Sequence, residues 1–318
     1  MKIKNASDFS NMTFKDLIEE HYNYQLDKVK VTTLKNYENM RPYFVNIENI
    51  KLEDFNIRHY EMWRQHINSK SISTRYKNTL YKYLKALMNF GAKWYDINFL
   101  KVYNKMSNFT NPNERRKEMS YYNYEEFKKF ISYEDDLRWK CVFEIFYYCG
   151  LRKGELKGLT WKDIYFDKKV LSVNKQITQL NNRTTFEFSD TKTKDSYRIV
   201  PITKVLLNDL KMLYEQSKKE YYNFNDDFFV ASDARPIADS TIYDRRTKLA
   251  EAANLKSIRL HDFRHSCASL LINNGANVTL VAKFLGHTKI EETLNTYSHM
   301  FSTALDNVVS IIDSLEDN

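Results

Sequence analysis

The sequence predicts a mainly α-helical protein with a small antiparallel β-sheet, divided into two domains. Its 318 residues are about twice the length of a typical domain, so a helical domain and a second, α+β domain are expected. Apolar residues recur every three or four positions over residues 13–100 and again from residue 203, whereas residues 164–202 show strand-like runs between polar turns. We expect a helical domain over 1–106, a linker over 107–120, an α+β domain over 121–304 and a tail helix over 305–318.

The helices of the first domain are predicted from four amphipathic runs, over residues 14–22, 32–44, 53–67 and 73–94. Thr13, Thr32 and either Ser73 or Thr74 precede three of these runs and are the expected N-caps. Four apolar side chains of the last run are expected to face the core: Leu80, Leu84, Leu87 and Trp94. The basic residues of that run are then left on the outside.

Positive charge is concentrated in this first domain. The formal charge of the chain is +8, and residues 1–110 hold 18 Lys and Arg against 11 Asp and Glu. Because each neutralised phosphate releases counterions, the skew favours DNA as partner, with a merely solvated basic face as the alternative. The expected DNA contacts are Arg64, Arg75, Lys77, Lys82 and Lys85, together with Arg115, Arg116 and Lys117 in the linker.

Cysteine usage and hydropathy indicate a cytoplasmic protein. Cys141, Cys149 and Cys267 lie in apolar stretches without metal-ligand spacing, which is typical of buried thiols in a reducing compartment. The N-terminus shows no signal-peptide pattern, and no apolar run of 18 residues exists to cross a membrane. We therefore expect no membrane association.

The second domain is predicted to place a small sheet between helices. The very apolar run 137–151 is expected to form a buried central helix that ends at Gly150. Three strand-like runs follow, at 169–180, 184–188 and 197–202. Turns at Asn181–Asn182 and at 191–196 would join them into one antiparallel sheet.

Polar residues stand out on apolar runs of this domain: Arg152 in GLRKGEL, His261 and Arg264 in HDFRHS, His287 in LGH and Tyr297 in NTYSHM. Two arginines and two histidines suit the free oxygens of a phosphodiester, while a phenolic oxygen attacks the phosphorus. Glu155 would hold the Arg152 guanidinium from behind, although these two residues taken alone favour a structural ion pair. Taken together, the residues indicate DNA strand cutting and rejoining, without metal or other cofactor.

Two lysines on the predicted turn at 191–196 are candidates for the proton donor. Lys192 and Lys194 would each be able to deliver an ammonium group to a leaving 5′-oxygen, although a lysine in a turn is usually only solvated.

Zinc is the competing interpretation of HDFRHS, because His261 and His265 stand four residues apart, as in a metalloprotease helix. We discount zinc since Asp262 replaces the usual glutamate, Arg264 would place a cation beside the metal, and no third ligand is evident.

In this order and spacing, GLRKGEL, TKTKDSYRIVPI, HDFRHS, LGH and TY resemble the tyrosine recombinase, or phage integrase, family over about residues 120–303. The resemblance implies a helical core-binding domain followed by a tyrosine-recombinase catalytic domain. It implies that Arg152 and Arg264 clamp the scissile phosphate, that His261 and His287 contact it, and that Tyr297 is the nucleophile. Lys192 would be the general acid, with Lys194 a substitute, and Glu155 a buried support.

The implied activity is site-specific recombination of double-stranded DNA through a 3′-phosphotyrosyl intermediate and a Holliday junction. Integration or excision of a mobile element, Xer-like resolution of replicon dimers, a type IB topoisomerase and a non-catalytic DNA-binding protein on the same fold remain as alternatives. The family also suggests a homotetramer on DNA, in which the tail at 305–318 docks on a neighbour, and a directionality factor. Helical patterning begins by Thr13, so no separate arm-binding domain is expected.

Overall fold

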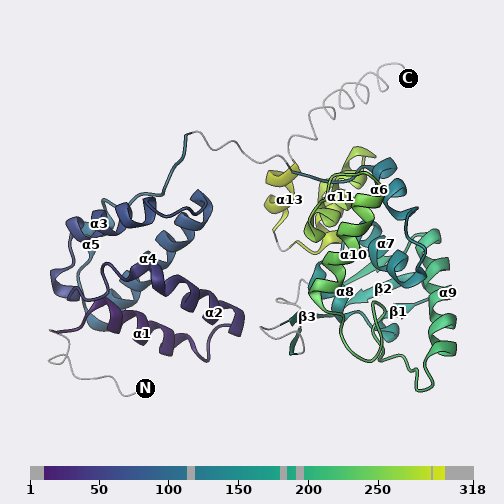
Figure 1. Cartoon of the computed structure of the whole chain (residues 1–318), viewed down its shortest axis with the longest axis horizontal. Helices are drawn as coiled ribbons and strands as arrows, with labels where there is room; N and C mark the ends of the chain where they lie inside the picture. Colours follow the sequence, from purple (N-terminus) through teal and green to yellow (C-terminus); the bar gives the residue numbers. More distant parts are fainter. Residues whose placement is uncertain (1–10, 113–118, 180–184, 191–196, 288, 298–318) are drawn as a thin grey trace, which may run out of the picture. The chain divides into compact units, whose positions relative to one another are not determined.

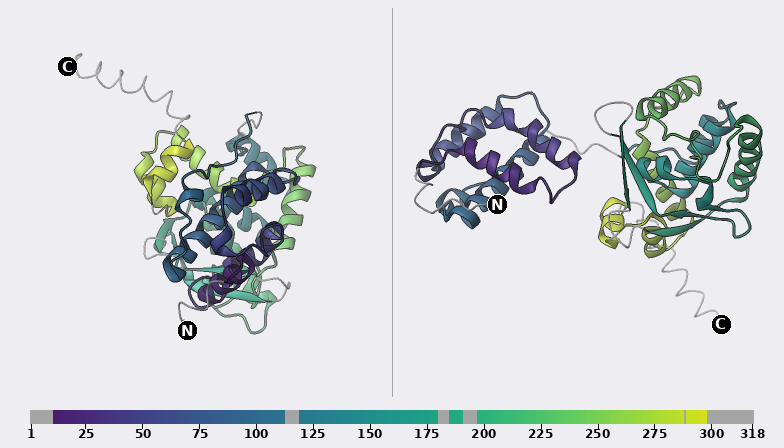
Figure 2. Two further views of the ribbon diagram at one scale, coloured as in Figure 1. Left: turned by 90° about the vertical axis from the view of Figure 1, so that its left-hand side faces the viewer. Right: turned by 90° about the horizontal axis from the view of Figure 1, so that it is seen from below.

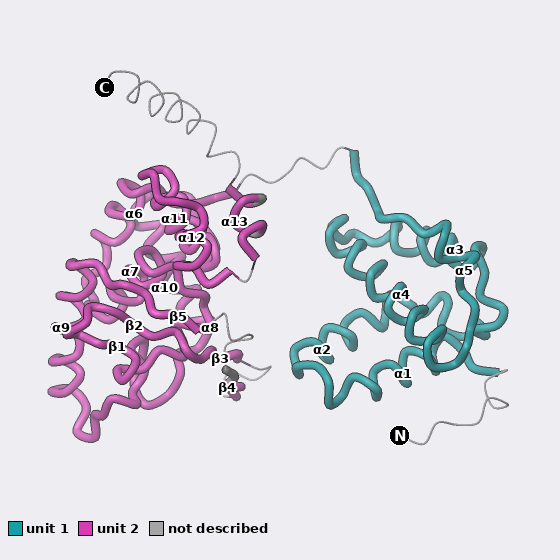
Figure 3. The backbone as a smooth tube through the Cα atoms, turned by 180° about the vertical axis from the view of Figure 1, so that it is seen from behind, with its two compact units in different colours: residues 1–116 teal, residues 117–318 magenta. Residues whose placement is uncertain are grey.

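The computed structural model divides the chain into two compact units, residues 1–116 and residues 117–318 (Figure 3). It describes residues 11–112, 119–179, 185–190, 197–287 and 289–297. The predicted tail helix at 305–318 and the Lys192 and Lys194 segment lie outside these ranges, as do Arg115, Arg116 and Lys117.

Unit 1 is built from helices, as predicted. Its α-helices and two short 3₁₀ helices are α1 (Phe14–Gln25), α2 (Val31–Met40), η2 (Arg41–Phe44), η3 (Leu52–Asp54), α3 (Ile57–Asn68), α4 (Thr74–Tyr95) and α5 (Leu100–Tyr103). They enclose an aromatic core in which Phe14, Phe44 and Trp63 are fully buried. The 22-residue helix α4 runs along this core and buries Leu80, Leu84 and Leu87.

The helix starts follow the expected capping chemistry in two places and depart from it in one. The Thr13 side chain accepts a hydrogen bond from the Asp16 amide, and the Ser73 side chain accepts one from the Tyr76 amide. The expectation for Thr32 is wrong, because α2 already begins at Val31, after Lys30 and without a side-chain cap. Trp94 is also not a core residue: it lies in the last turn of α4 and is 37% exposed.

Residues 107–109 pack on unit 1 although the sequence predicts that a linker begins there. Phe109 is buried in the unit 1 core, and its amide donates to Asn78 Oδ1 at 2.8 Å. The Asn78 side-chain amide in turn donates to the Phe109 carbonyl at 2.9 Å. These two hydrogen bonds attach the chain at Phe109 to α4.

Unit 2 combines helices with two small antiparallel sheets (Figure 1). Its helices are α6 (Tyr124–Ile131), α7 (Leu137–Cys149), α8 (Lys153–Gly158), η4 (Trp161–Asp163), α9 (Lys204–Glu220), α10 (Asp239–Ala252), α11 (Leu260–Asn273), α12 (Val278–Leu285) and α13 (Ile290–Tyr297). Its strands are β1 (Ile164–Tyr165), β2 (Val170–Val173), β3 (Lys175–Gln179), β4 (Phe186–Asp190) and β5 (Arg198–Pro201).

The prediction of a single sheet is wrong, because the strand-like run 169–180 divides at Asn174. β2 pairs with β1 and β5, whereas β3 pairs with β4 alone. Asn174 lies between β2 and β3, where its side-chain amide donates to Asp163 Oδ1 at 2.7 Å, and Lys175 forms an ion pair with the same buried carboxylate. These side-chain bonds draw the chain toward Asp163 at the point where a continuous strand would run straight on.

The core of unit 2 is centred on α7, as the apolar run 137–151 predicts. Phe143, Phe146 and Tyr147 are fully buried and pack with Phe263 of α11 and Phe127 of α6. The helices α11, α12 and α13 gather on one side of the unit, and α9 lies on the opposite side (Figures 1 and 2). None of the described helices is long and apolar enough to cross a membrane.

Gly150 ends α7 in a left-handed conformation, with φ of 60°, at a point where α12 comes very close. A Cβ atom there would lie 2.6 Å from Leu285 Cδ2. Gly275 has a similarly positive φ of 82°, but a Cβ atom there would meet nothing within 4 Å. Comparing alanine substitutions at the two glycines therefore separates the cost of backbone strain from the cost of a steric clash.

We expect Gly150→Ala to lower the free energy of unfolding by about 2–4 kcal/mol, because left-handed strain adds to overpacking against Leu285. Gly275→Ala, the matched control, should cost only about 1 kcal/mol, the strain alone. Urea unfolding of both variants measures the difference. Equal losses would contradict the close contact between the end of α7 and α12.

Candidate active site

Glu155 joins two arginines from distant parts of unit 2. Its carboxylate is 3% exposed and accepts hydrogen bonds from Arg198 Nη1 (3.1 Å) and Nη2 (2.9 Å) and from Arg152 Nη1 (2.8 Å). Burial alone would raise the pKa of Glu155, but the hydrogen bonds and charge of Arg198, with the charge of Arg152, lower it to about 2. The carboxylate is therefore ionised at neutral pH and holds both guanidinium groups in place.

The same arginines bind carbonyl groups at the C-terminal end of α12. Arg152 Nη2 donates to the Gly286 carbonyl at 3.1 Å, and Arg198 Nε donates to the Phe284 carbonyl at 3.0 Å. Gly286 adopts a left-handed conformation, and a Cβ atom there would lie 3.0 Å from the Arg198 side chain. The glycine thus lets the turn that leads to His287 approach the guanidinium closely.

Arg264 is a buried cation, and one of its N–H donor groups has no partner among the described residues. It lies in α11 with 1% exposure, and its Nη1 donates to the Gly150 carbonyl at 2.7 Å. Its Nη2 has no hydrogen-bond partner within the described part of the chain. A guanidinium stays charged at neutral pH. A buried, charged donor without a partner is costly, so this atom is suited to an anion such as a phosphate oxygen.

The two histidines of the predicted site lie on different elements. His261 is exposed in the first turn of α11, and His287 follows Gly286, with its Nδ1 2.7 Å from Thr293 Oγ1. Burial, with the positive charges of Arg264 and Arg152, lowers the pKa of His287 to about 3. Neighbouring groups partly desolvate the His261 ring although its side chain reaches solvent, and this desolvation and the charge of Arg264 lower the pKa of His261 as well. Both imidazoles are therefore neutral at neutral pH and can donate or accept a hydrogen bond.

Tyr297 ends α13 and reaches back to α11. Its side chain is 1% exposed, and its hydroxyl oxygen lies 2.6 Å from His265 Nδ1. Burial raises the pKa of Tyr297 above its usual value, while the charge of Arg264 opposes that change. The charge of Arg264, a predicted phosphate ligand, therefore acts on Tyr297, the predicted nucleophile of the same chain.

The structure joins Arg152 to Glu155 and to the Gly286 carbonyl, next to His287. Tyr297 contacts His265, which directly follows Arg264 and lies one helical turn after His261. Lys192 and Lys194 lie outside the described residues, in the segment between β4 and β5. No cluster of three or more potential metal ligands exists among the residues that the structure describes. His265 is one of the two histidines in the zinc interpretation, and its Nδ1 is hydrogen-bonded to the Tyr297 hydroxyl.

Two residues of the site were missed at the sequence level. Arg198 stands in YRIVPI, where a basic residue at an inward-facing position of an apolar strand was the available signal. His265 follows Arg264 directly, and its spacing from His261 was interpreted only as possible metal ligation. Neither pattern identifies a partner, because Glu155 and Tyr297 are 43 and 32 residues away along the chain.

The basic residues of unit 1 fall into two groups. Arg75 and Lys82 are exposed on α4, seven residues and about two helical turns apart, and Lys93 continues the same face. Their side-chain nitrogens have no hydrogen-bond or ion-pair partner in the described part of the unit, although Lys93 lies over the Trp94 ring. This face is available to a polyanion.

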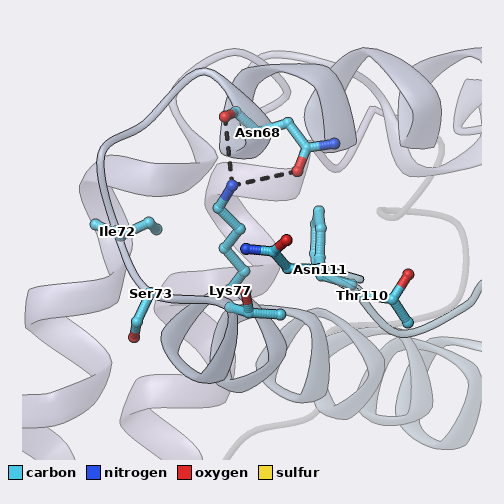
Figure 4. A pocket seen from close by; sticks show the side chains of 8 residues that line it. Asn68, Ile72, Ser73, Lys77, Thr110 and Asn111 are labelled. Carbon is cyan, nitrogen blue, oxygen red and sulfur yellow. Dashed lines mark hydrogen bonds between the residues drawn. The ribbon is translucent and has the colours of Figure 1, made fainter. Parts of the chain in front are cut away.

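The other predicted DNA contacts are engaged within unit 1. Arg64 Nη1 donates to the Ser107 carbonyl at 2.7 Å and Nη2 to the Asn108 carbonyl at 3.2 Å, so we do not retain it as a DNA contact. Lys85 lies 4.2 Å from the centre of the Tyr103 ring. Lys77 donates to the carbonyl and side-chain oxygens of Asn68, both at 3.3 Å, beside a polar hollow of about 340 Å³ (Figure 4).

Arginines held by a buried carboxylate, two neutral histidines and a tyrosine, gathered in a helical α+β unit, fit the class of DNA strand-exchange proteins that use a tyrosine. The phage integrase family model matches residues 117–303, more than half of the chain. The chain therefore belongs to the phage integrase family, as its motifs predict.

Known relatives agree with this membership, and solved structures agree with the fold. The ICEBs1 integrase of Bacillus subtilis is 34% identical over 210 residues, 63% of this chain and 56% of that protein, so the match spans little more than half of the relative. The integrase of Staphylococcus phage L54a is 24% identical over 327 residues, 93% of this chain and 91% of that protein.

In fold, the chain is similar to the Tn1549 transposon integrase in complex with transposon right end DNA, with a TM-score of 0.76 at 19% identity over 90% of this chain and 95% of that one. A lambda integrase dimer bound to a COC′ core site matches with a TM-score of 0.64 at 15% identity, over 90% of this chain and 95% of that one. At these identities the likeness shows the fold alone.

We expect Arg198→Ala to lower the free energy of unfolding by about 3 kcal/mol, because it removes two of the bonds to a buried carboxylate. Arg259→Ala is the matched control: this arginine also pairs with a buried carboxylate, that of Asp262, but its own side chain is 73% exposed. Its loss should cost less than about 1 kcal/mol. Chemical denaturation compares the two, and a small loss for both would show that Glu155 does not depend on Arg198.

Proposed function

We propose that this protein is a site-specific recombinase that cuts and rejoins double-stranded DNA for integration or excision of a mobile element. The observation that carries the proposal is the buried, unpartnered Nη2 of Arg264, a donor suited to a phosphate oxygen, on the same helix as His265, which binds the Tyr297 hydroxyl. The integrases of ICEBs1 and phage L54a and the fold match to a transposon integrase support mobile-element integration. Dimer resolution is the alternative, supported by a XerC-like tyrosine recombinase of Caldanaerobacter subterraneus that is 29% identical over 76% of this chain.

In the proposed reaction, Arg152 and Arg264 hold two non-bridging oxygens of the scissile phosphate. Negative charge grows on these oxygens in the transition state, where fixed guanidinium and imidazole donors stabilise it most strongly. His261 and His287, both neutral, contribute hydrogen bonds from two sides. Glu155 and Arg198 position the clamp and do not touch the phosphate.

The Tyr297 oxygen attacks phosphorus and forms a phosphotyrosyl ester with the 3′ end, the phenol proton passes to the neutral His261 imidazole, and the bond to the 5′-oxygen breaks. Lys192 donates the proton that the leaving 5′-oxygen needs, with Lys194 as the alternative donor. The ester conserves the energy of the broken bond, so attack by a second 5′-hydroxyl reseals the strand without ATP. Two such exchanges pass through a Holliday junction.

Four copies of the chain are needed to exchange two duplexes in this way. We propose that the tail at 305–318 docks on a neighbouring copy, since Leu305, Val308, Val309, Ile312 and Leu315 share one predicted helix face. The direction of recombination would then be set by a separate factor. The mass of the complex with its DNA site distinguishes four copies from one.

The covalent intermediate tests the proposed chemistry. In EDTA, nicked duplexes from the DNA flanking the gene should yield an SDS-resistant adduct with the wild-type protein. Tyr297→Phe should yield none, because it removes the attacking oxygen and little else. Arg264→Ala should reduce adduct formation by at least about a hundredfold, the usual cost of losing one such donor. An adduct that survives Tyr297→Phe would exclude Tyr297 as nucleophile.

We also propose that the α4 face formed by Arg75, Lys82 and Lys93 follows the DNA backbone. Replacing Arg75 or Lys82 by alanine should weaken duplex binding and lower the slope of log K against log salt by about 0.9 each. Arg41→Ala is the control, because Arg41 is half-exposed in the same unit but pairs with Glu19 at 2.7 Å. Titrations at several salt concentrations measure the slopes, and equal slopes for all three variants would refute this DNA face.

A further inference from the structure

The Tyr297 hydroxyl is bound by a residue that the proposed reaction does not use. Its oxygen lies 2.6 Å from His265 Nδ1, and its ring is packed among buried side chains of α11 and α12: Cys267, Ala268, Ile272, Val281 and Leu285. With 1% of Tyr297 exposed, the phosphorus of a DNA backbone cannot reach this oxygen. The phenol must therefore leave its site before it can attack.

Protonation decides what this hydrogen bond does. Burial raises the pKa of Tyr297, so its hydroxyl is the donor at neutral pH. Burial and the neighbouring His261 lower the pKa of His265 to about 4, so its imidazole is neutral and Nδ1 is the acceptor. Transfer of a phenol proton to so weak a base is strongly unfavourable. The contact therefore secures the phenol rather than activating it.

His265 also connects Tyr297 to the exposed side of the site. The His265 ring meets the His261 ring edge to face, with centroids 4.8 Å apart. His261 is exposed one turn earlier on α11 and is a proposed phosphate contact. A phosphate that draws the His261 ring outward would remove the packing that fixes the ring of His265.

We propose that His265 is a positioning residue for the nucleophile: it retains Tyr297 in a buried resting place until DNA occupies the site. The inference rests on the proposed role of Tyr297 as the attacking residue. In the resting protein the hydroxyl is shielded both from phosphate and from water. Release breaks one hydrogen bond and forms no covalent bond.

Chemical nitration of the DNA-free protein tests the retention directly. Trypsin releases residues 290–318 as one peptide, and Tyr297 is the single tyrosine in it, so mass spectrometry reads this site alone. His265→Leu should raise the rate of Tyr297 nitration by tetranitromethane about tenfold, because it leaves a buried hydroxyl without an acceptor. His265→Asn is the matched control: it keeps an acceptor oxygen near the Nδ1 position and should behave like wild type. Equal rates in His265→Leu and wild type would overturn the proposal.

A second measurement avoids any dependence on how His265→Leu folds. In ¹⁵N-histidine-labelled protein, Tyr297→Phe should move the His265 Nδ1 signal toward the position of a free acceptor nitrogen, since it deletes one hydroxyl and keeps the ring. The His265→Asn spectrum assigns that signal. An unchanged Nδ1 signal in Tyr297→Phe would overturn the contact itself.

Adduct formation separates retention from catalysis. On nicked duplex, His265→Leu should form the phosphotyrosyl adduct at least as fast as wild type, whereas loss of the adduct with unchanged nitration would make His265 a catalytic base and overturn the proposal. If wild type itself forms no adduct on any duplex, the proposed function fails. The nitration and ¹⁵N results would still decide whether His265 retains Tyr297.

Discussion

The site depends on one buried carboxylate, Glu155, which two arginines share. Taking a carboxylate out of water is unfavourable unless hydrogen bonds and positive charge replace the lost hydration, and Arg152 and Arg198 supply both. Their remaining donors bind the carbonyls of Phe284 and Gly286. A single ion pair network thereby fixes α8, β5 and the turn before His287, three elements that are far apart in the sequence.

This network leaves the site with an excess of positive charge. Arg152 and Arg198 share a single carboxylate and Arg264 binds a backbone carbonyl. The nearby histidines His261 and His287 are neutral because burial and the arginine charges suppress their protonation. Such a site is incomplete without an anion. A DNA phosphate would supply the missing negative charge and the missing acceptor for Arg264 at once, and for that reason binding and electrostatic catalysis use the same groups.

The position of Tyr297 adds a second constraint. A nucleophile that is permanently exposed beside a cationic cluster would be deprotonated more easily and would react with any phosphodiester that entered. Here the phenol is buried against α11 and α12 and hydrogen-bonded to His265. Arg152 and Arg198 are already joined through Glu155, while the Tyr297 hydroxyl is engaged by His265. Under the proposed retention by His265, DNA would control the assembly of the site.

The sequence by itself determined the helical first unit, the buried helix α7 that ends at Gly150, and the motif residues from Arg152 to Tyr297, because periodicity, caps and short motifs are local signals. It did not separate the two sheets, since that division depends on the bonds of Asn174 and Lys175 to Asp163. It also did not reveal that Arg64 binds carbonyls of its own unit, that Arg198 supports Glu155 or that His265 holds Tyr297. Each of these is a pairing between residues distant in the chain, and only the tertiary structure decides which partner a polar side chain meets.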